Sequence, residues 1–224
     1  MSPVKIAAIA DVHSPRFLND FNIALSKCEK PDLFLFAGDM IHRENAREYI
    51  RVLDSVESHL GSDFPILACF GNEDPVDIQD ALHFATRDRL TFLDGRAITL
   101  NLAGSRIAIV GISAVSAELI EVQSDTVTEM RTIFEERATQ LSHLLQDASR
   151  SSDYVILLMH FNPLLEINPT KFSWWVSRAV EKAPPDLIIH GHIHNSTRKK
   201  VEIDATIIMN VALPAIGSIT ELNL

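Results

Sequence analysis

Five short apolar runs in this chain each end in a polar or glycine residue, and this recurrence limits the possible folds more than any other feature. The runs lie at residues 4–10, 32–37, 65–70, 154–159 and 186–190. They are apolar on both faces, which is typical of strands at the centre of a sheet covered on both sides. Because ligands bind at the carboxyl ends of strands in α/β sheets, we expect the polar residues to form one site.

The segments between these runs predict the rest of the architecture. Helical periodicity predicts helices at residues 17–29, 44–60, 126–148 and 172–182, and a further helix after Pro75. Ser124 and Asp125 are the expected N-terminal cap of the long helix. Short strands with hairpin turn signals are predicted at 91–93, 97–102, 106–111, 197–203, 206–210 and 215–222. Since no stretch reads as a linker, we expect one α/β domain over residues 1–224.

Composition and charge exclude several classes of function. A hydrophobic fraction of 46% and a charged fraction of 22% are those of an ordinary globular protein. The net charge of -10 disfavours broad binding to nucleic acid or anionic lipid. No run approaches the roughly 18 apolar residues that cross a membrane, and the first strand begins too early for a signal sequence. We therefore expect a cytoplasmic protein in which Cys28 and Cys69 are reduced core thiols.

The strand ends together offer a set of candidate metal ligands. In chain order they are Asp11, His13, Asp39, Asn72, His160, His192 and His194. Seven oxygen and nitrogen ligands fit two divalent ions of borderline hardness when one carboxylate bridges them. In the stretch from Gly191 to His194, the alternation of a strand places His192 and His194 on the same side. Gly191, which has no side chain, permits a close approach to the backbone. A histidine pair alone also fits ordinary hydrogen-bonded residues, so the other strand ends carry the metal prediction.

The order Asp-x-His, Gly-Asp, Gly-Asn-x-Asp, His and Gly-His-x-His resembles the calcineurin-like metallophosphoesterase superfamily from Asp11 to His194. The resemblance implies a four-layer α/β/β/α sandwich of two facing mixed sheets flanked by helices, without a separate capping domain. It implies a first metal held by Asp11, His13, Asp39 and His194. It also implies a second metal held by Asp39, Asn72, His160 and His192. Manganese, iron, zinc and nickel occur across the family, and the ligand types do not choose among them.

The resemblance also implies metal-dependent hydrolysis of a small phosphate ester. Two cations about 3.5 to 4 Å apart turn a bridging water toward hydroxide and bind the phosphoryl oxygens for in-line attack. The cations would supply local positive charge to a chain that is acidic overall. Phosphodiesters are expected to be slightly preferred over monoesters. The reason is an analogy with family members that, like this chain, lack the usual histidine of the Gly-Asn-His motif.

One motif departs from the family pattern. Many members have Gly-Asn-His followed by an acid, whereas this chain has Glu73 in place of the histidine, followed by Asp74. Losing a positioned proton donor costs about 100- to 10,000-fold. Glu73 is expected to be a poor donor because nearby cations lower the pKa of a carboxylate. The candidate catalytic residues are Asp39, Asn72, Glu73, Asp74 and His42, and the candidate substrate-binding residues are Arg16 and Asn72.

Two of these candidates have alternatives. His42, three residues after Asp39, either replaces the missing donor or simply begins the following helix. Arg16 is either a phosphate clamp, because a guanidinium suits phosphate oxygens, or a solvated loop residue. His190 is expected to be a core histidine, and the histidines at 59, 83 and 143 are expected at the surface.

Two other functions remain as alternatives. One is a catalytically weak or inactive protein-binding scaffold, which exposed apolar surface around Phe172, Trp174 and Trp175 would support. The other is a repair-type nuclease, which fits less well because the chain has no basic stripe and no room for an extra capping domain. The sequence carries no indication of oligomeric state.

Overall fold

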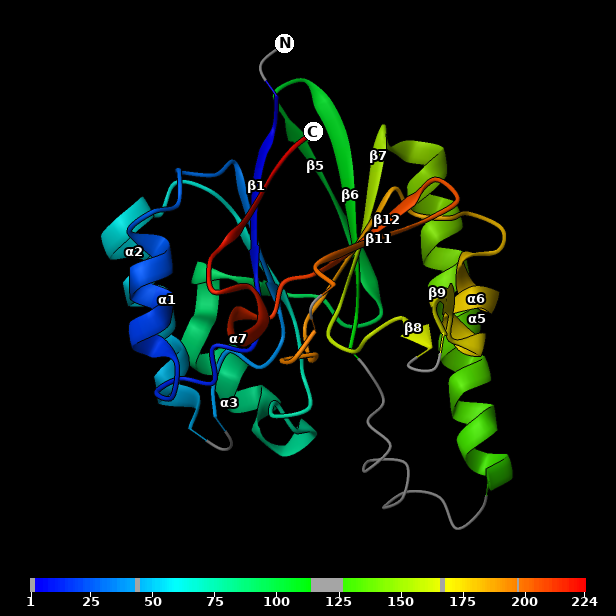
Figure 1. Ribbon diagram of the computed structural model, residues 1–224, viewed down its shortest axis with the longest axis horizontal. Coiled ribbons are helices and arrows are strands. Elements are labelled where there is room, and N and C mark those ends of the chain that lie inside the picture. Colours follow the sequence, from blue (N-terminus) through cyan, green and yellow to red (C-terminus); the bar gives the residue numbers. More distant parts are fainter. Residues whose placement is uncertain (1–2, 43–44, 114–126, 166–167, 197) are drawn as a thin grey trace.

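The computed structural model describes the whole chain except residues 1–2, 43–44, 114–126, 166–167 and 197. Two mixed sheets face each other, and helices cover the outer face of each (Figure 1). The predicted α/β/β/α layers are therefore confirmed. The predicted cap at Ser124 and Asp125 lies outside the described residues.

The first sheet has the strand order β13-β1-β2-β3-β4. Its strands are β1 (Lys5–Ile9), β2 (Leu33–Ala37), β3 (Ile66–Cys69), β4 (Thr91–Phe92) and β13 (Thr220–Asn223). Strands β1 to β4 run parallel, and β13 runs antiparallel to β1. The helices on its outer face are α1 (Leu18–Leu25), α2 (Ala46–Leu60) and α3 (Val76–Thr86), and α3 is followed by the short helix η1 (Arg87–Arg89).

The second sheet has the strand order β11-β12-β10-β7-β6-β5. Its strands are β5 (Arg96–Leu102), β6 (Ser105–Ile112), β7 (Tyr154–Met159), β10 (Leu187–His190), β11 (Lys200–Ile203) and β12 (Thr206–Asn210). The four inner strands run parallel, and β5 and β11 join the edges antiparallel. The outer face is covered by α5 (Val127–Ser151) and α6 (Trp174–Val180), beside the hairpin of β8 (Leu164–Leu165) and β9 (Asn168–Phe172).

Strand β2 shows why the sequence gives these layers. All five of its residues are buried. Leu33 and Leu35 point into the core between the two sheets, whereas Phe34 and Phe36 pack against the helices of the first sheet. Because successive side chains of a strand point to opposite faces, a continuous apolar run can fill two cores at once.

The end of the chain differs from the prediction. The strand expected at residues 215–222 is wrong in its first half, where helix α7 (Leu213–Ile216) forms and ends at Gly217, whose φ is 73°. Proline, as at 214, suits the first turn of a helix, and glycine suits the left-handed residue that follows a helix. These helix start and stop signals outweigh the strand pattern here. The helix predicted from Phe172 begins instead at Trp174, because Phe172 ends β9.

None of the helices in the described ranges combines the length and the hydropathy needed to cross a membrane.

Candidate metal centre

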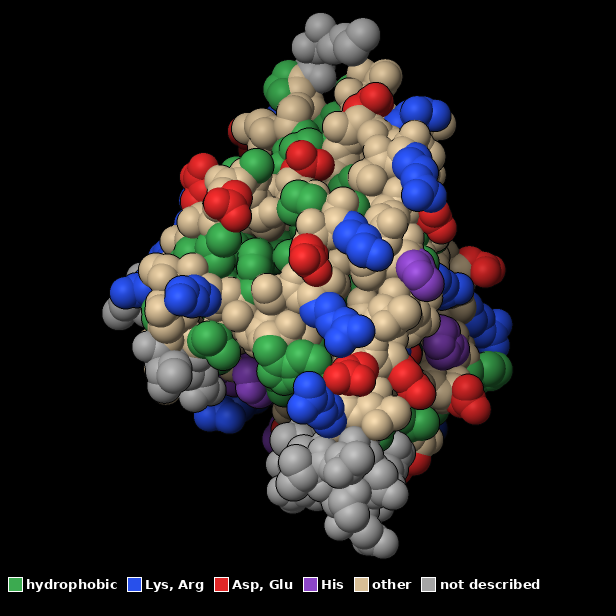
Figure 2. Space-filling view, turned by 90° about the vertical axis from the view of Figure 1, so that its right-hand side faces the viewer, with side chains coloured by type: hydrophobic (Ala, Val, Ile, Leu, Met, Phe, Trp, Pro, Cys, Tyr) green, Lys and Arg blue, Asp and Glu red, His purple; other side chains and the backbone are tan. Residues whose placement is uncertain are grey.

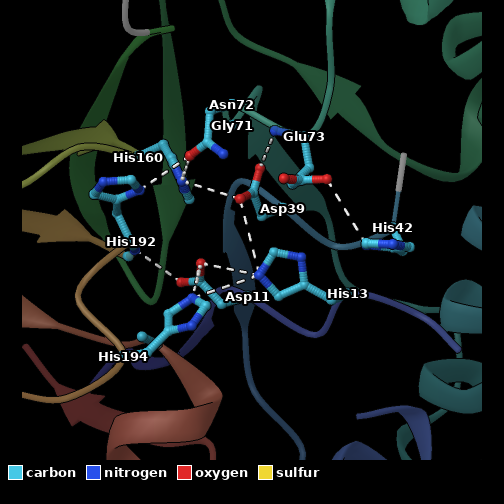
Figure 3. Close-up of polar contacts among 12 residues, drawn as sticks. Asp11, His13, Asp39, His42, Gly71, Asn72, Glu73, His160, His192 and His194 are labelled. Atoms are coloured by element: carbon cyan, nitrogen blue, oxygen red, sulfur yellow. Dashed lines mark hydrogen bonds and ion pairs between the residues drawn. The ribbon is translucent and has the colours of Figure 1, made fainter. Parts of the chain in front are cut away.

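The seven predicted ligands meet beyond the carboxyl ends of strands from both sheets. They lie in loops that follow β1, β2 and β3 of the first sheet and β7 and β10 of the second (Figure 3). The predicted convergence of the strand ends is therefore present in the structure.

One group of ligand atoms surrounds the carboxylate of Asp11, which is fully buried. Its Oδ1 lies 2.9 Å from Nε2 of His194 and 3.6 Å from Nε2 of His13. The two imidazole nitrogens are 3.5 Å apart. The other oxygen, Oδ2, accepts a hydrogen bond of 2.8 Å from the backbone N–H of His192, which fixes the carboxylate's orientation.

A second group converges on the side-chain oxygen of Asn72. Nε2 of His160 and Nδ1 of His192 each lie 3.0 Å from this Oδ1. Nε2 of His160 is also 3.3 Å from Oδ2 of Asp39. The ring of Phe161, which the sequence did not single out, lies 4.6 Å from the His192 ring and packs beside this group.

Asp39 lies between the two groups. Its Oδ2 is 3.9 Å from Nε2 of His13 and 3.3 Å from Nε2 of His160. Its Oδ1 accepts a 2.8 Å hydrogen bond from the backbone N–H of Glu73. A single oxygen, Oδ2, therefore faces both groups.

The chemistry and the spacing of these atoms fit divalent metal ions. Ligand atoms of Asp11, His13 and His194 lie within 4.8 Å of one another, and so do those of Asp11, Asp39 and His160. Two ligands bound at about 2.1 Å and at right angles on one ion would lie about 3 Å apart, close to several of the distances above. Two buried carboxylates facing imidazoles are also a donor set that a cation would neutralise.

The backbone is strained at four of the proposed ligands. Asp11, His13, Asp39 and His192 have positive φ angles of 60°, 43°, 54° and 69°. Such conformations in residues other than glycine cost on the order of 1 to 3 kcal/mol each and cluster at functional sites. Four of the seven proposed ligands therefore have the kind of backbone strain that is common at functional sites.

Two glycines allow the strand ends to approach the carboxylates. A Cβ on Gly71 would lie 2.0 Å from Oδ1 of Asp39, and one on Gly191 would lie 2.5 Å from both Oδ2 of Asp11 and Cβ of Ala10. The close approach predicted at Gly191 is confirmed, and the group that approaches is the Asp11 carboxylate.

Hydrogen bonding sets the orientation and charge of His160. Its Nδ1–H donates to the carbonyl oxygen of Ala37 at 2.8 Å, and this fixes the ring with Nε2 directed toward Asp39 and Asn72. Burial disfavours the imidazolium, but the charges of Asp39 and Asp11 outweigh burial and raise the pKa of His160 to about 9. His190, by contrast, is a core histidine as predicted, because burial lowers its pKa to about 4 and its Nδ1–H donates to the Gly191 carbonyl.

Asp74 lies beneath the site. Its Oδ2 accepts hydrogen bonds from the backbone N–H groups of Asp39 at 3.1 Å and Gly71 at 2.9 Å, and the residue is 2% exposed. Burial and the charge of Asp39 raise its pKa to about 7. Asp74 therefore holds two strand ends of the centre together.

The Asp74→Asn variant is expected to flatten the pH dependence of stability of the metal-free protein. Between the ordinary pKa of 3.8 and about 7, the unfolded chain releases the Asp74 proton while the folded protein retains it. The free energy of unfolding should then fall as pH rises across this window, by roughly 1 to 4 kcal/mol from this group. Asparagine keeps an acceptor oxygen without the charge. Urea unfolding at several pH values would measure the difference, and parallel curves for both proteins would contradict it.

Two polar side chains lie at the rim of the centre. Nδ1 of His42 is 3.8 Å from Oε2 of Glu73, and their side chains are 61% and 15% exposed. The His42 ring lies 6.5 Å from the ring of His13 (Figure 3). Arg16 is exposed, and its guanidinium lies over the Phe17 ring at 4.9 Å.

Comparison with known proteins identifies the group to which the chain is related. The model of the calcineurin-like phosphoesterase family matches residues 4–196. A comparison with curated protein sequences gave no match.

Several solved structures share the fold at low sequence identity. The protein TT1561 of Thermus thermophilus superposes with a TM-score of 0.62 at 11% identity, covering 99% of each chain. A Staphylococcus aureus protein described as a 5′-nucleotidase gives 0.60 at 15% identity, over 93% of this chain and 48% of its own. Thermus thermophilus sulfate thiohydrolase SoxB gives 0.54 at 15% identity, over 86% of this chain and 38% of its own. At these identities the likeness establishes the fold alone.

The family match covers the ligand-bearing loops after β1, β2, β3, β7 and β10, and the fold and the converging side chains agree with it. The chain belongs to the calcineurin-like phosphoesterase family.

Proposed function

We propose that this protein hydrolyses a small phosphate ester, with phosphodiesters slightly preferred, at a centre of two divalent metal ions. The observation that carries the proposal is the position of Asp39, whose Oδ2 faces His13 on one side and His160 on the other. Asp11, His13 and His194 would complete one metal site, and Asn72, His160 and His192 the other. A carboxylate oxygen shared in this way is what a pair of metal ions requires of a bridging ligand.

The residues of the centre would have different roles in binding and catalysis. When bound, the two ions would lower the pKa of water and attract phosphoryl oxygens. Asp39 and Asp11 would keep the imidazoles oriented. His42 is exposed at the rim and would donate a hydrogen bond to the leaving oxygen, with Glu73 beside it to hold the ring. The Asn72 amide would contact a substrate oxygen as well as the second ion, and Arg16 would bind the phosphate from the rim.

A pair of synthetic substrates tests the proposal. A nitrophenyl phosphodiester and a nitrophenyl phosphomonoester would each be incubated with the metal-stripped protein, before and after manganese is restored. We expect metal-dependent turnover of both, faster for the diester. Absence of metal-dependent turnover of either substrate would contradict the enzymatic proposal, whereas a faster monoester would contradict only the preference.

The His42→Ala variant is expected to distinguish between leaving groups. Turnover of an alkyl ester should fall about 100-fold or more, because an alkoxide needs a proton, while turnover of a nitrophenyl ester should change only a few-fold. His59→Ala is a matched control, since the Nδ1 of His59 bonds to the Ser55 carbonyl within α2, away from the centre. An equal loss on both esters would show that His42 does not assist the leaving group.

The three rings that would support the scaffold alternative differ in exposure. Trp174 is 47% exposed, but its ring packs 6.1 Å from that of Phe134. Phe172 and Trp175 are only partly exposed, and both pack against the core beneath α5 and α6. On the face shown in Figure 2, separate basic side chains follow one another from the upper right to the lower centre, with acidic side chains on both sides of them.

A further inference from the structure

Two loops of the metal centre are joined through Ser14, the residue after His13. The backbone N–H of Ser14 donates to the Met40 carbonyl at 3.0 Å, and the Ser14 carbonyl accepts from the N–H of His42 at 3.0 Å. Ser14 and Ile41 form an isolated parallel bridge. The loop after β1 and the loop after β2 therefore extend the sheet beyond the ends of the two strands.

A buried carboxylate holds this junction from the adjacent helix. Oε2 of Glu48, in the first turn of α2, accepts a 2.7 Å hydrogen bond from the hydroxyl of Ser14, which is fully buried. Glu48 is 9% exposed, and its two oxygens each lie 3.0 Å from NH1 of Arg51. A carboxylate is costly to bury, but here it has a hydroxyl donor, a guanidinium and the positive end of a helix dipole.

The residue beside this junction is in a conformation that needs support. His13 has a φ of 43°, and its backbone N–H donates to the Asp39 carbonyl at 3.0 Å. Strained residues keep their conformation only where the surrounding structure holds them on both sides. Asp39 holds His13 from one side, and Ser14, anchored by Glu48, holds it from the other.

We propose that Glu48 is a positioning residue for the first metal ion, acting through Ser14 to keep His13 aimed at Asp11 and His194. This inference rests on the proposed function, because it assumes that these three residues and Asp39 hold an ion. Helix α2 would then support a metal ligand, although none of its residues belongs to the ligand motifs of the sequence.

The arrangement predicts an asymmetric effect on the two metal sites. His13 comes from the loop that Ser14 anchors, whereas Asn72, His160 and His192 follow β3, β7 and β10. Loss of the Glu48 contact should therefore weaken one binding step and spare the other. A general loss of stability would weaken both.

The test is a titration of the metal-free protein with cobalt(II). Calorimetry and the visible absorption of the bound ion measure each binding step. Glu48→Ala and Ser14→Ala should each weaken one step by about 10-fold and leave the other within about threefold. This is the low end of the range for groups that support metal ligands, because these two side chains act on His13 through the backbone. The double variant should lose no more than either single one. Glu48→Gln, which keeps an acceptor oxygen for Ser14, should restore most of the affinity.

Glu57→Gln is the matched control, because Glu57 lies on the same helix and accepts a hydrogen bond of 2.8 Å from Nε of Arg89 at the surface. Unchanged binding in Glu48→Ala, or equal weakening of both steps, would overturn the inference. If Glu48→Ala does not fold, Ser14→Ala, which leaves the carboxylate and Arg51 in place, decides by the same criteria. Failure of the unmodified protein to bind cobalt at all would instead contradict the proposed function.

Discussion

The Asp39→Asn variant is expected to lose metal-dependent turnover by on the order of 1,000-fold and to bind fewer metal ions than the unmodified protein. The carboxylate is 1% exposed and its Oδ2 faces both groups of ligand atoms, so one substitution removes a charge from both proposed metal sites. The asparagine oxygen can still accept the hydrogen bond from Glu73, so the fold should be retained. Elemental analysis of the purified protein, together with the nitrophenyl diester assay, measures both effects.

The Asp32→Asn variant is the matched control for this experiment. Asp32 precedes the other end of the same strand, is exposed, and accepts a 2.8 Å hydrogen bond from the backbone N–H of Lys5. It should bind metal and turn over substrate as the unmodified protein does. Unchanged metal content in Asp39→Asn would contradict the bridging role.

The Gly191→Ala variant is expected to disrupt the centre without removing any ligand. The added methyl group would lie 2.5 Å from both Cβ of Ala10 and Oδ2 of Asp11, and 3.2 Å from the Ala37 carbonyl oxygen. Ala10, Asp11 and Ala37 are all fully buried, so overpacking should cost roughly 1 to 3 kcal/mol of unfolding free energy. It should also break the hydrogen bond between the His192 N–H and Asp11 and weaken metal binding at least about tenfold.

The Gly217→Ala variant separates this clash from the general cost of replacing a glycine. A Cβ on Gly217 would meet no atom within 4 Å, although its φ of 73° costs an alanine about 1 kcal/mol. Urea unfolding and cobalt titration of both variants would measure the contrast. The prediction for Gly191→Ala is wrong if that variant binds cobalt normally and is no less stable than Gly217→Ala.

The buried strands could be predicted because they depend on local patterns, whereas the four layers were expected from the resemblance to a known family. The run from Leu33 to Ala37 is apolar at every position, and only a strand covered on both faces buries it completely. The same local reasoning failed at residues 215–222, where Pro214 and Gly217 favour a helical turn that the strand pattern conceals. In α2 the apolar side chain of Ile50 is 36% exposed, whereas Tyr49 and Val52 occupy the core.

The identity of the proposed ligands was also visible in the sequence, but the geometry among them was not. All seven follow predicted strands, so their residue types and order could be read directly. One oxygen of Asp39 faces both groups, and the other accepts a hydrogen bond from the Glu73 N–H. This choice depends on the positions of His13, His160 and Glu73, which follow three different strands. The contact between His42 and Glu73 likewise joins loops that follow different strands.

The sequence by itself determined most of the strands, the list of candidate ligands and the presence of Glu73 where the family pattern has a histidine, since periodicity and motif order act over a few neighbouring residues. The layered arrangement was expected from the resemblance to a known family. Only the tertiary structure decided that Asp11 fills the space left by Gly191, that Asp39 presents one oxygen to both groups, and that Glu48 holds Ser14 across 34 residues of chain. These contacts depend on the register of parallel strands and on how α2 packs against the first sheet. No short stretch of sequence encodes either of them, because each depends on packing and hydrogen bonds between side chains that are far apart in the chain.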